Sequence, residues 1–124
     1  MKRTAVAGLG IWVAVTALAG CGTPSTEALV EQGITYFQVG RLDQAETTLK
    51  RALDQNPSDP DALFYMGRIC DLKGLQERAM YYYQCCMDAD PSYVAAQKHL
   101  LEAQRQLGPA GQALRFIPDL PQQD

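Results

Sequence analysis

The chain has 124 residues, of which 47% are hydrophobic, and its 11 basic and 14 acidic side chains give a formal net charge of −3. An acidic chain with scattered basic residues lacks the electrostatic footprint of a nucleic-acid-binding protein. It has one histidine, His99, no nucleophile motif and no Gly-rich phosphate loop. We therefore expect no enzyme activity, no catalytic residue and no cofactor.

Residues 1–20 have the pattern of a bacterial secretory signal. Two basic residues precede an uncharged, mostly apolar run from Thr4 to Ala19. The run ends in Leu18-Ala19-Gly20-Cys21, which resembles the lipobox of bacterial lipoproteins. The resemblance implies cleavage before Cys21, a diacylglycerol on its thiol and a fatty acid such as palmitate on its new amine. An uncleaved membrane anchor and an ordinary cleaved signal are the alternatives.

A lipidated Cys21 would hold the mature protein on a membrane without a transmembrane helix, because three acyl chains bind a bilayer far more firmly than one. Residues 21–25 would form a short tether that keeps the domain near the bilayer. Gly22 stands where an Asp commonly retains such proteins at the inner membrane of enteric bacteria. We therefore expect a periplasm-facing lipoprotein, with the outer membrane favoured where the organism has one.

Residues 26–93 hold one pattern written twice, as 26–59 and 60–93, at a spacing of 34 residues. The shared residues suit stacked helical hairpins, because they are small, apolar or helix-ending. The spacing predicts helices over 26–39, 42–55, 60–73, 76–89 and 94–107. Eight positions are identical in the two copies: Ala28/Ala62, Leu29/Leu63, Gly33/Gly67, Gly40/Gly74, Ala45/Ala79, Asp54/Asp88, Pro57/Pro91 and Ser58/Ser92.

Both copies resemble the tetratricopeptide repeat (TPR). The second departs from the family pattern with Cys70 where Tyr is usual and Cys86 where Ala is usual. The resemblance implies an all-α fold, in which two helical hairpins and a C-terminal capping helix form a solenoid over 26–107, and a family of interaction scaffolds. The pattern positions hold Leu29, Gly33, Tyr36, Gly40, Ala45, Leu49, Ala52 and Pro57 in the first copy, and Leu63, Gly67, Cys70, Gly74, Ala79, Tyr83, Cys86 and Pro91 in the second.

Local chemistry predicts the ends and crossings of these helices. Gly40 and Gly74 should end the first helix of each pair in a left-handed conformation. Asp59 and Pro60 read as an N-cap and a first helical residue. Gly33 and Ala45 should meet where the first two helices cross, because only small side chains allow a close approach.

The C-terminal part divides into a capping helix, 94–107, and a proline-containing tail, 108–124. Leu100, Leu101 and Leu107 should pack the capping helix inward. The tail carries Pro118 and Pro121 and should be extended. Its apolar residues suggest that it either folds back on the solenoid or binds a partner: Phe116, Ile117 and Leu120.

Three cysteines remain after lipidation, namely Cys70, Cys85 and Cys86, and their spacing fits no zinc pattern. We expect two small buried residues and one half-exposed thiol, and no metal site. A bridge from Cys70 to one of the others stays open, as does a redox or metal role. Tyr81 and Tyr82 either form an aromatic surface patch or cover neighbouring loops.

In TPR proteins the first helix of each repeat lines a concave groove that receives the partner. Domains of this family that clamp acidic C-termini use Lys and Asn where this chain has Val30 and Ile34, so that ligand class is disfavoured. An apolar strip flanked by charges suits an amphipathic helix or an extended apolar peptide. The groove residues that the resemblance implies are Val30, Ile34, Phe37, Phe64, Arg68, Asp71 and Leu72, with Glu27, Gln38, Asp61, Lys98, Glu102 and Arg105 around them.

The leading hypothesis is a membrane-anchored, non-catalytic adaptor or assembly factor that binds another envelope protein. Lipoproteins of similar architecture serve as pilotins and pilus or secretin assembly factors. The alternative is a structural envelope protein whose groove is filled by its own C-terminal tail. Tandem repeats of this kind also self-associate, so homodimerisation stays open.

Overall fold

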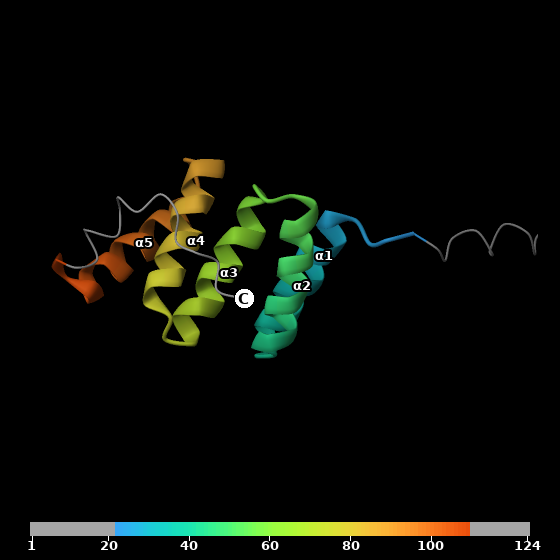
Figure 1. The fold of residues 1–124 in the computed structure, drawn as a ribbon, viewed down its shortest axis with the longest axis horizontal. Coiled ribbons are helices and arrows are strands. Elements are labelled where there is room, and N and C mark those ends of the chain that lie inside the picture. Colours follow the sequence, from blue (N-terminus) through green and yellow to red (C-terminus); the bar gives the residue numbers. More distant parts are fainter. Residues whose placement is uncertain (1–21, 110–124) are drawn as a thin grey trace, which may run out of the picture.

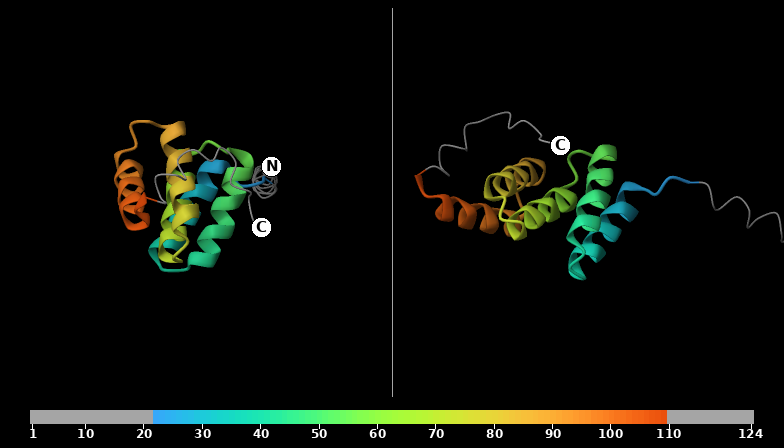
Figure 2. Two further views of the ribbon diagram at one scale, coloured as in Figure 1. Left: turned by 60° about the vertical axis from the view of Figure 1, so that its left-hand side comes forward. Right: turned by 60° about the horizontal axis from the view of Figure 1, so that its bottom comes forward.

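The computed structural model describes residues 22–109, and within this range the chain forms five helices and no strand (Figure 1). The predicted signal and lipidated Cys21, and the tail beyond Pro109, lie outside the described residues. The helices follow one another along the long axis, with α1 and α2 at one end and α5 at the other (Figures 1 and 2). Their bounds are α1 Thr26–Gln38, α2 Leu42–Gln55, α3 Pro60–Leu72, α4 Gln76–Ala89 and α5 Val94–Leu107.

The helices begin and end where the sequence predicts, except that α1 and α3 each end one residue earlier. Asp59 caps α3, since its carboxylate accepts a hydrogen bond of 2.9 Å from the backbone amide of Ala62, and Pro60 is the first helical residue. Ser25 caps α1 in the same way through Ala28. These caps satisfy amides that the first turn leaves without partners.

Gly40 and Gly74 turn the chain at the ends of α1 and α3, as predicted. Their φ angles are +78° and +76°, which side chains other than glycine rarely adopt. Each glycine amide donates a hydrogen bond of 3.0 Å to the carbonyl three residues earlier, Phe37 or Asp71. Each pair of helices is thereby joined by the same tight turn.

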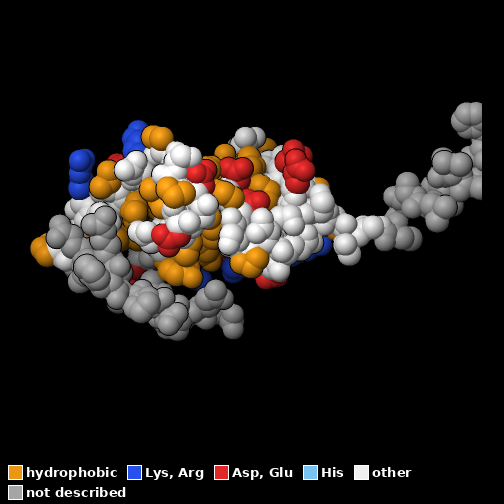
Figure 3. Space-filling view, turned by 90° about the horizontal axis from the view of Figure 1, so that it is seen from above, with side chains coloured by type: hydrophobic (Ala, Val, Ile, Leu, Met, Phe, Trp, Pro, Cys, Tyr) orange, Lys and Arg blue, Asp and Glu red, His pale blue; other side chains and the backbone are white. Residues whose placement is uncertain are grey.

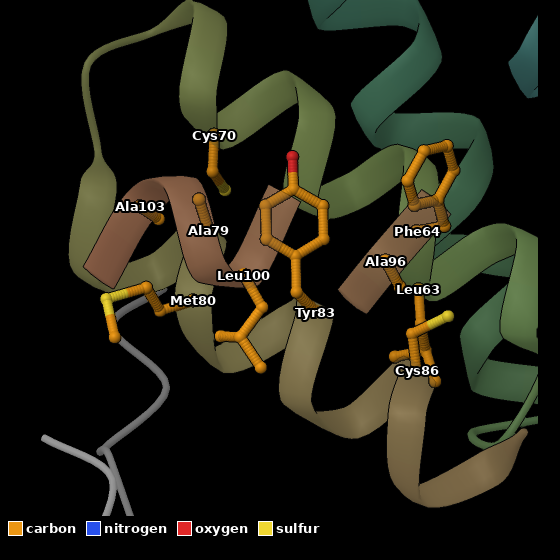
Figure 4. Packing of buried hydrophobic residues seen from close by; sticks show 10 residues of the cluster. All are labelled: Leu63, Phe64, Cys70, Ala79, Met80, Tyr83, Cys86, Ala96, Leu100 and Ala103. Atoms are coloured by element: carbon orange, nitrogen blue, oxygen red, sulfur yellow. The ribbon is translucent and has the colours of Figure 1, made fainter. Parts of the chain in front are cut away.

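The helices stack as consecutive pairs, with α1 against α2, α3 against both α2 and α4, and α5 against α4. Two groups of buried side chains fill the interior, and Leu53, Tyr65 and Tyr82 pack against both groups. The result is a TPR-like helical-hairpin solenoid with one continuous core. Figure 4 shows the group formed by α3, α4 and α5, with Tyr83 at its centre, Phe64 on one side, and Ala79 and Leu100 on the other.

Glycines let the paired helices approach closely. A Cβ atom built on Gly67 would lie 2.5 Å from the Tyr83 ring, and one built on Gly33 would lie 2.6 Å from the end of Leu49. Gly33 therefore faces the side chain of Leu49 across the contact between α1 and α2. A large side chain on the second helix takes the space that the glycine leaves.

Two leucines are more exposed than interior positions would be, and one of them, Leu101, was predicted to pack inward. Leu75 is 41% exposed because it precedes α4 as its N-cap, and Leu101 is 49% exposed on α5. Tyr82 is less exposed than a residue of a surface patch would be, because it packs against both core groups. Tyr81 is half-buried, and its ring meets Tyr82 edge-on at 5.6 Å.

A polar cluster joins the two repeats on the side of α2. The Lys73 ammonium forms ion pairs with Asp43 at 2.9 Å and with Glu46 at 2.5 Å, and Lys50 pairs with Glu46 at 2.9 Å. Burial by itself raises the pKa of Glu46, but the hydrogen bonds from Lys73 and Lys50 outweigh it and lower that pKa below its ordinary value. Lys73 thus ties the end of α3 to α2.

The described part of the chain offers no helix with the length and apolar character that crossing a bilayer requires. Figure 3 shows one face of the molecule, where hydrophobic side chains gather around the middle and acidic side chains lie among them.

Candidate binding groove

A hollow of about 270 Å³ lies between α3 and α5 and is closed at one end by the start of α4. Its walls come from the first helices of successive pairs, which is where the family resemblance places the concave groove. Most of its lining is polar or charged. The lining residues are Arg68, Asp71 and Leu72 from α3, Gln76 from α4, and His99, Glu102, Ala103 and Gln106 from α5.

A row of aromatic rings runs beneath this face from α1 to α5. The ring centre of Phe37 lies 5.2 Å from that of Tyr65, which lies 5.3 Å from Phe64, and Phe64 lies 5.7 Å from His99. His99 also stacks on Tyr83, with ring centres 5.5 Å apart and planes 22° apart. Such ring pairs contribute beyond the area they bury, so they help to hold His99, which lines the hollow, against α3 and α4.

Asp71 is fixed by a hydrogen bond from the core. The hydroxyl of the fully buried Tyr83 donates to the Asp71 carboxylate over 2.5 Å. Burial first, and then this hydrogen bond, raises the pKa of Tyr83 well above its ordinary value. Tyr83 therefore remains a donor at neutral pH, and the carboxylate keeps a fixed position at the rim of the hollow.

Arg68 lies across the row, with its guanidinium 5.5 Å from the ring centre of Phe37. Burial, and next the positive charge of Arg68, lower the pKa of His99 below its ordinary value. His99 is therefore neutral at neutral pH. The hollow then holds one positive side chain, Arg68, against two carboxylates, Asp71 and Glu102, so its charge is negative on balance.

The side-chain oxygen of Gln76 adds an acceptor to this site. It is buried, and no group among residues 22–109 donates a hydrogen bond to it. A buried acceptor without a donor costs free energy that a ligand N–H group would recover. Charge and hydrogen-bonding capacity thus both favour a ligand that presents donors and a positive charge.

The structure divides the predicted groove residues into three sets. Arg68, Asp71 and Leu72 line the hollow together, and Leu72 is 59% exposed. Val30 and Phe64 are only 6% and 7% exposed, which corrects the expectation that they form an accessible apolar strip. They belong to the core beneath the groove. The third set is Ile34 and Phe37, which are half-buried and pack against the core.

Sequence reasoning missed His99 and Gln76. His99 stands 34 residues after Tyr65, which lies in the same row, so shifting Tyr65 by one repeat would have identified it. Of the flanking residues expected on α5, Glu102 lines the hollow, whereas Arg105 lies beside a different hollow.

The cysteines pack in the core and do not line the hollow. Cys70, Cys85 and Cys86 carry free thiols, and the Cys86 thiol donates to the Pro60 carbonyl at 3.2 Å. Burial, and then nearby carboxylates, raise the pKa of Cys86 to about 11, so its thiol is not ionised at neutral pH. Across residues 22–109, no group of three or more His, Cys, Asp or Glu side chains is arranged to hold a metal ion.

Comparison with known proteins agrees with this geometry. A family model described as "Tetratricopeptide repeat" matches residues 30–94. The protein named "Cellulose synthase operon protein C" from Xanthomonas axonopodis pv. citri (strain 306) is 37% identical over 76 residues, which are 61% of this chain and 5% of that protein. The crystal structure of MamA protein superposes with a TM-score of 0.62 at 25% identity, over 73% of this chain and 47% of that one. The chain thus spans only a part of each relative.

Proposed function

Because the chain belongs to the tetratricopeptide repeat family, we propose that it is a non-catalytic adaptor or assembly factor of the bacterial envelope. Proteins of this family generally bind other proteins through their helical repeats. The observation that carries the proposal is the hollow between α3 and α5, where charged side chains held by the core face a common space.

The proposed ligand is a peptide segment of one envelope protein that bears a lysine or arginine beside polar groups. The Asp71 and Glu102 carboxylates outnumber the Arg68 guanidinium in the hollow, and Gln76 offers an unused acceptor. Two residues of the predicted apolar strip, Val30 and Phe64, are buried, so little of the strip is left for an extended apolar peptide. A segment of mixed polarity, such as an amphipathic helix with a basic face, fits these groups better.

The membrane part of the proposal rests on the sequence before Thr26. A basic start, an apolar run and Leu18-Ala19-Gly20-Cys21 support lipidation at Cys21, with the domain facing the periplasm and the outer membrane favoured. A short tether, 21–25, would hold the groove near the bilayer. The partner would then be a membrane-associated protein or one that works close to the membrane.

Co-isolation from solubilised membranes tests the groove. The tagged full-length chain should recover one envelope protein, and Glu102→Lys should abolish recovery because it reverses the negative charge of the hollow and repels a basic segment. Asp54→Lys, on the exposed side of α2, is the matched control and should leave recovery unchanged. Equal recovery with both variants contradicts a partner in this groove, and recovery of the same chain alone would identify homodimerisation.

A further inference from the structure

The last helix, α5, has a face that no described element covers. Leu101 stands 34 residues after Gly67, at the position that faces the second helix in the first two pairs, and it is 49% exposed. A hollow of about 320 Å³ lies on this face, lined by Leu101, Gln104, Arg105, Gly108 and Pro109. We call it the end face. A nitrogen of the Gln104 side chain is buried there without a hydrogen-bond acceptor among residues 22–109.

The chain leaves α5 through a glycine at the repeat position of the glycines that turn the chain after α1 and α3. Gly108 follows Gly74 by 34 residues, as Gly74 follows Gly40, and its φ is +59°. Its amide donates to the carbonyl of Arg105, three residues earlier, as the other two glycine amides do. After each of the first two turns, the chain forms a helix that packs back on its predecessor.

The sequence beyond this turn continues in the same register. Three of its apolar residues, Ala113, Ile117 and Leu120, fall on positions that are completely buried in α2 and α4, and Gln112, Arg115 and Asp119 fall on positions that are exposed in α2. This is the pattern of a helix with one buried face. The matched buried positions are Ala113 with Ala45 and Ala79, Ile117 with Leu49 and Tyr83, and Leu120 with Ala52 and Cys86.

We propose that residues 110–117 form the second helix of a third, truncated repeat and that this helix covers the end face of α5. The occupant is therefore the chain's own tail, seated through Ala113 and Ile117 against Leu101. Pro118 ends the helix after about two turns, because its ring cannot follow a helical residue without a clash. In this arrangement Leu120 packs at the far side of the end face.

Two departures from the first repeats fit a wider third hairpin. Leu101 replaces the glycine that lets the earlier helices touch, so the third pair must stand farther apart. Pro109 has no amide to repeat the bond that Leu75 donates to the Cys70 carbonyl over 2.9 Å, so this turn is held less tightly. A wider crossing accommodates the larger Leu101–Ile117 pair.

The consequence concerns the groove. The end face uses Leu101, Gln104 and Arg105, whereas the hollow between α3 and α5 uses His99, Glu102 and other residues from a different side of α5. A tail seated on the end face leaves that hollow open. This placement of the tail is independent of the proposed partner, because it involves only the end face of α5.

Hydrogen–deuterium exchange of the full-length chain tests this seat. The amides of 114–117 should be protected, because the first four amides of a helix have no intrahelical partner, and Leu101→Asp should remove that protection while exchange in α1–α4 stays unchanged. Leu72→Asp is the matched control, because Leu72 is an exposed leucine in the groove, and it should leave the protection intact. Ile117→Asp should repeat the effect of Leu101→Asp.

Three results overturn the proposal. The first is an unprotected 114–117 in the unmodified chain. The second is protection that Leu72→Asp removes and Leu101→Asp does not, which would place the tail in the groove. The third is protection that both substitutions remove or that neither changes, which would mean that the tail has no specific seat on α5.

Discussion

The Tyr83 hydroxyl donates a hydrogen bond to Asp71 from the centre of the core, and so connects the packing of α3 and α4 to the rim of the groove. Tyr83 is completely buried, whereas Asp71 is half-buried and lines the hollow. One side chain therefore fills the space beside Gly67 and also positions a carboxylate that faces a ligand. Substitutions that alter the packing around Tyr83 should therefore change the position of the Asp71 carboxylate in the groove.

Tyr83→Phe should lower the free energy of unfolding by about 1.5 kcal/mol, because a hydrogen bond to a charged group is lost while the ring is kept. Urea denaturation measures the change. Tyr93→Phe is the control, since its hydroxyl donates to Asp61 over 2.7 Å at an exposed site and should matter less. Equal losses of unfolding free energy in the two variants would show that burial does not strengthen the hydrogen bond from Tyr83 to Asp71.

Gly67→Ala should destabilise the fold by about 1–3 kcal/mol, because the new Cβ meets the rigid Tyr83 ring. Gly33→Ala should cost less, since Leu49 can change its rotamer and alanine favours the helix by up to about 1 kcal/mol. Thermal unfolding of both variants checks this order. Adding Tyr83→Leu to Gly67→Ala should recover part of the loss, and a further loss would contradict the steric explanation.

Glu46→Gln should reduce stability at neutral pH by about 0.5 kcal/mol, since it weakens the cluster with Lys50 and Lys73. The pKa of Glu46 is lower in the folded chain than its ordinary value of 4.5. Its contribution is therefore complete above pH 4.5 and is lost as the pH falls below that value, where Glu46 becomes protonated.

Stability measured against pH should therefore show the wild-type and Glu46→Gln curves converging below pH 4.5, and salt should narrow their separation at neutral pH. Asp54→Asn, at an exposed position of α2, should leave the curve unchanged. A separation between wild type and Glu46→Gln that persists in acid would mean that Glu46 acts through packing and not through charge.

Cys21→Ser should move the protein from the membrane to the soluble fraction and abolish incorporation of an alkyne-tagged fatty acid, because it removes the thiol that the lipobox resemblance marks for lipidation. In-gel fluorescence after labelling gives the readout. Cys85→Ser, which changes a cysteine inside the folded domain, should retain the label. Labelling that survives Cys21→Ser would exclude lipidation at this position.

The helices were predictable because their ends depend on local chemistry. Gly40, Gly74 and the Asp59–Pro60 pair each fix a turn or a cap without help from distant residues. The 34-residue spacing then indicates which helices pair, since each repeat must bury its apolar face against the next. Local signals and the repeat agree, so the sequence alone predicts the order and bounds of the five helices.

The groove was less predictable because exposure depends on how closely neighbouring pairs stack. Val30 and Phe64 occupy first-helix positions that the resemblance assigns to the concave face, but they pack into the core. His99 reaches the hollow because α5 lies over the Tyr83 ring, a contact between distant residues. A repeat pattern gives the register of a side chain, but the depth at which it lies depends on tertiary packing.

The most direct test of the central claim is crosslinking in living cells from a photoreactive amino acid at Leu72, which lies exposed in the hollow between α3 and α5. Arg51, exposed on α2, provides the control position. The account predicts that Leu72 captures one envelope protein through a segment that contains lysine or arginine, that Glu102→Lys abolishes capture, and that Arg51 does not capture this protein. Capture of the same protein from both positions, or capture that Glu102→Lys does not change, would contradict a partner-binding groove at this site.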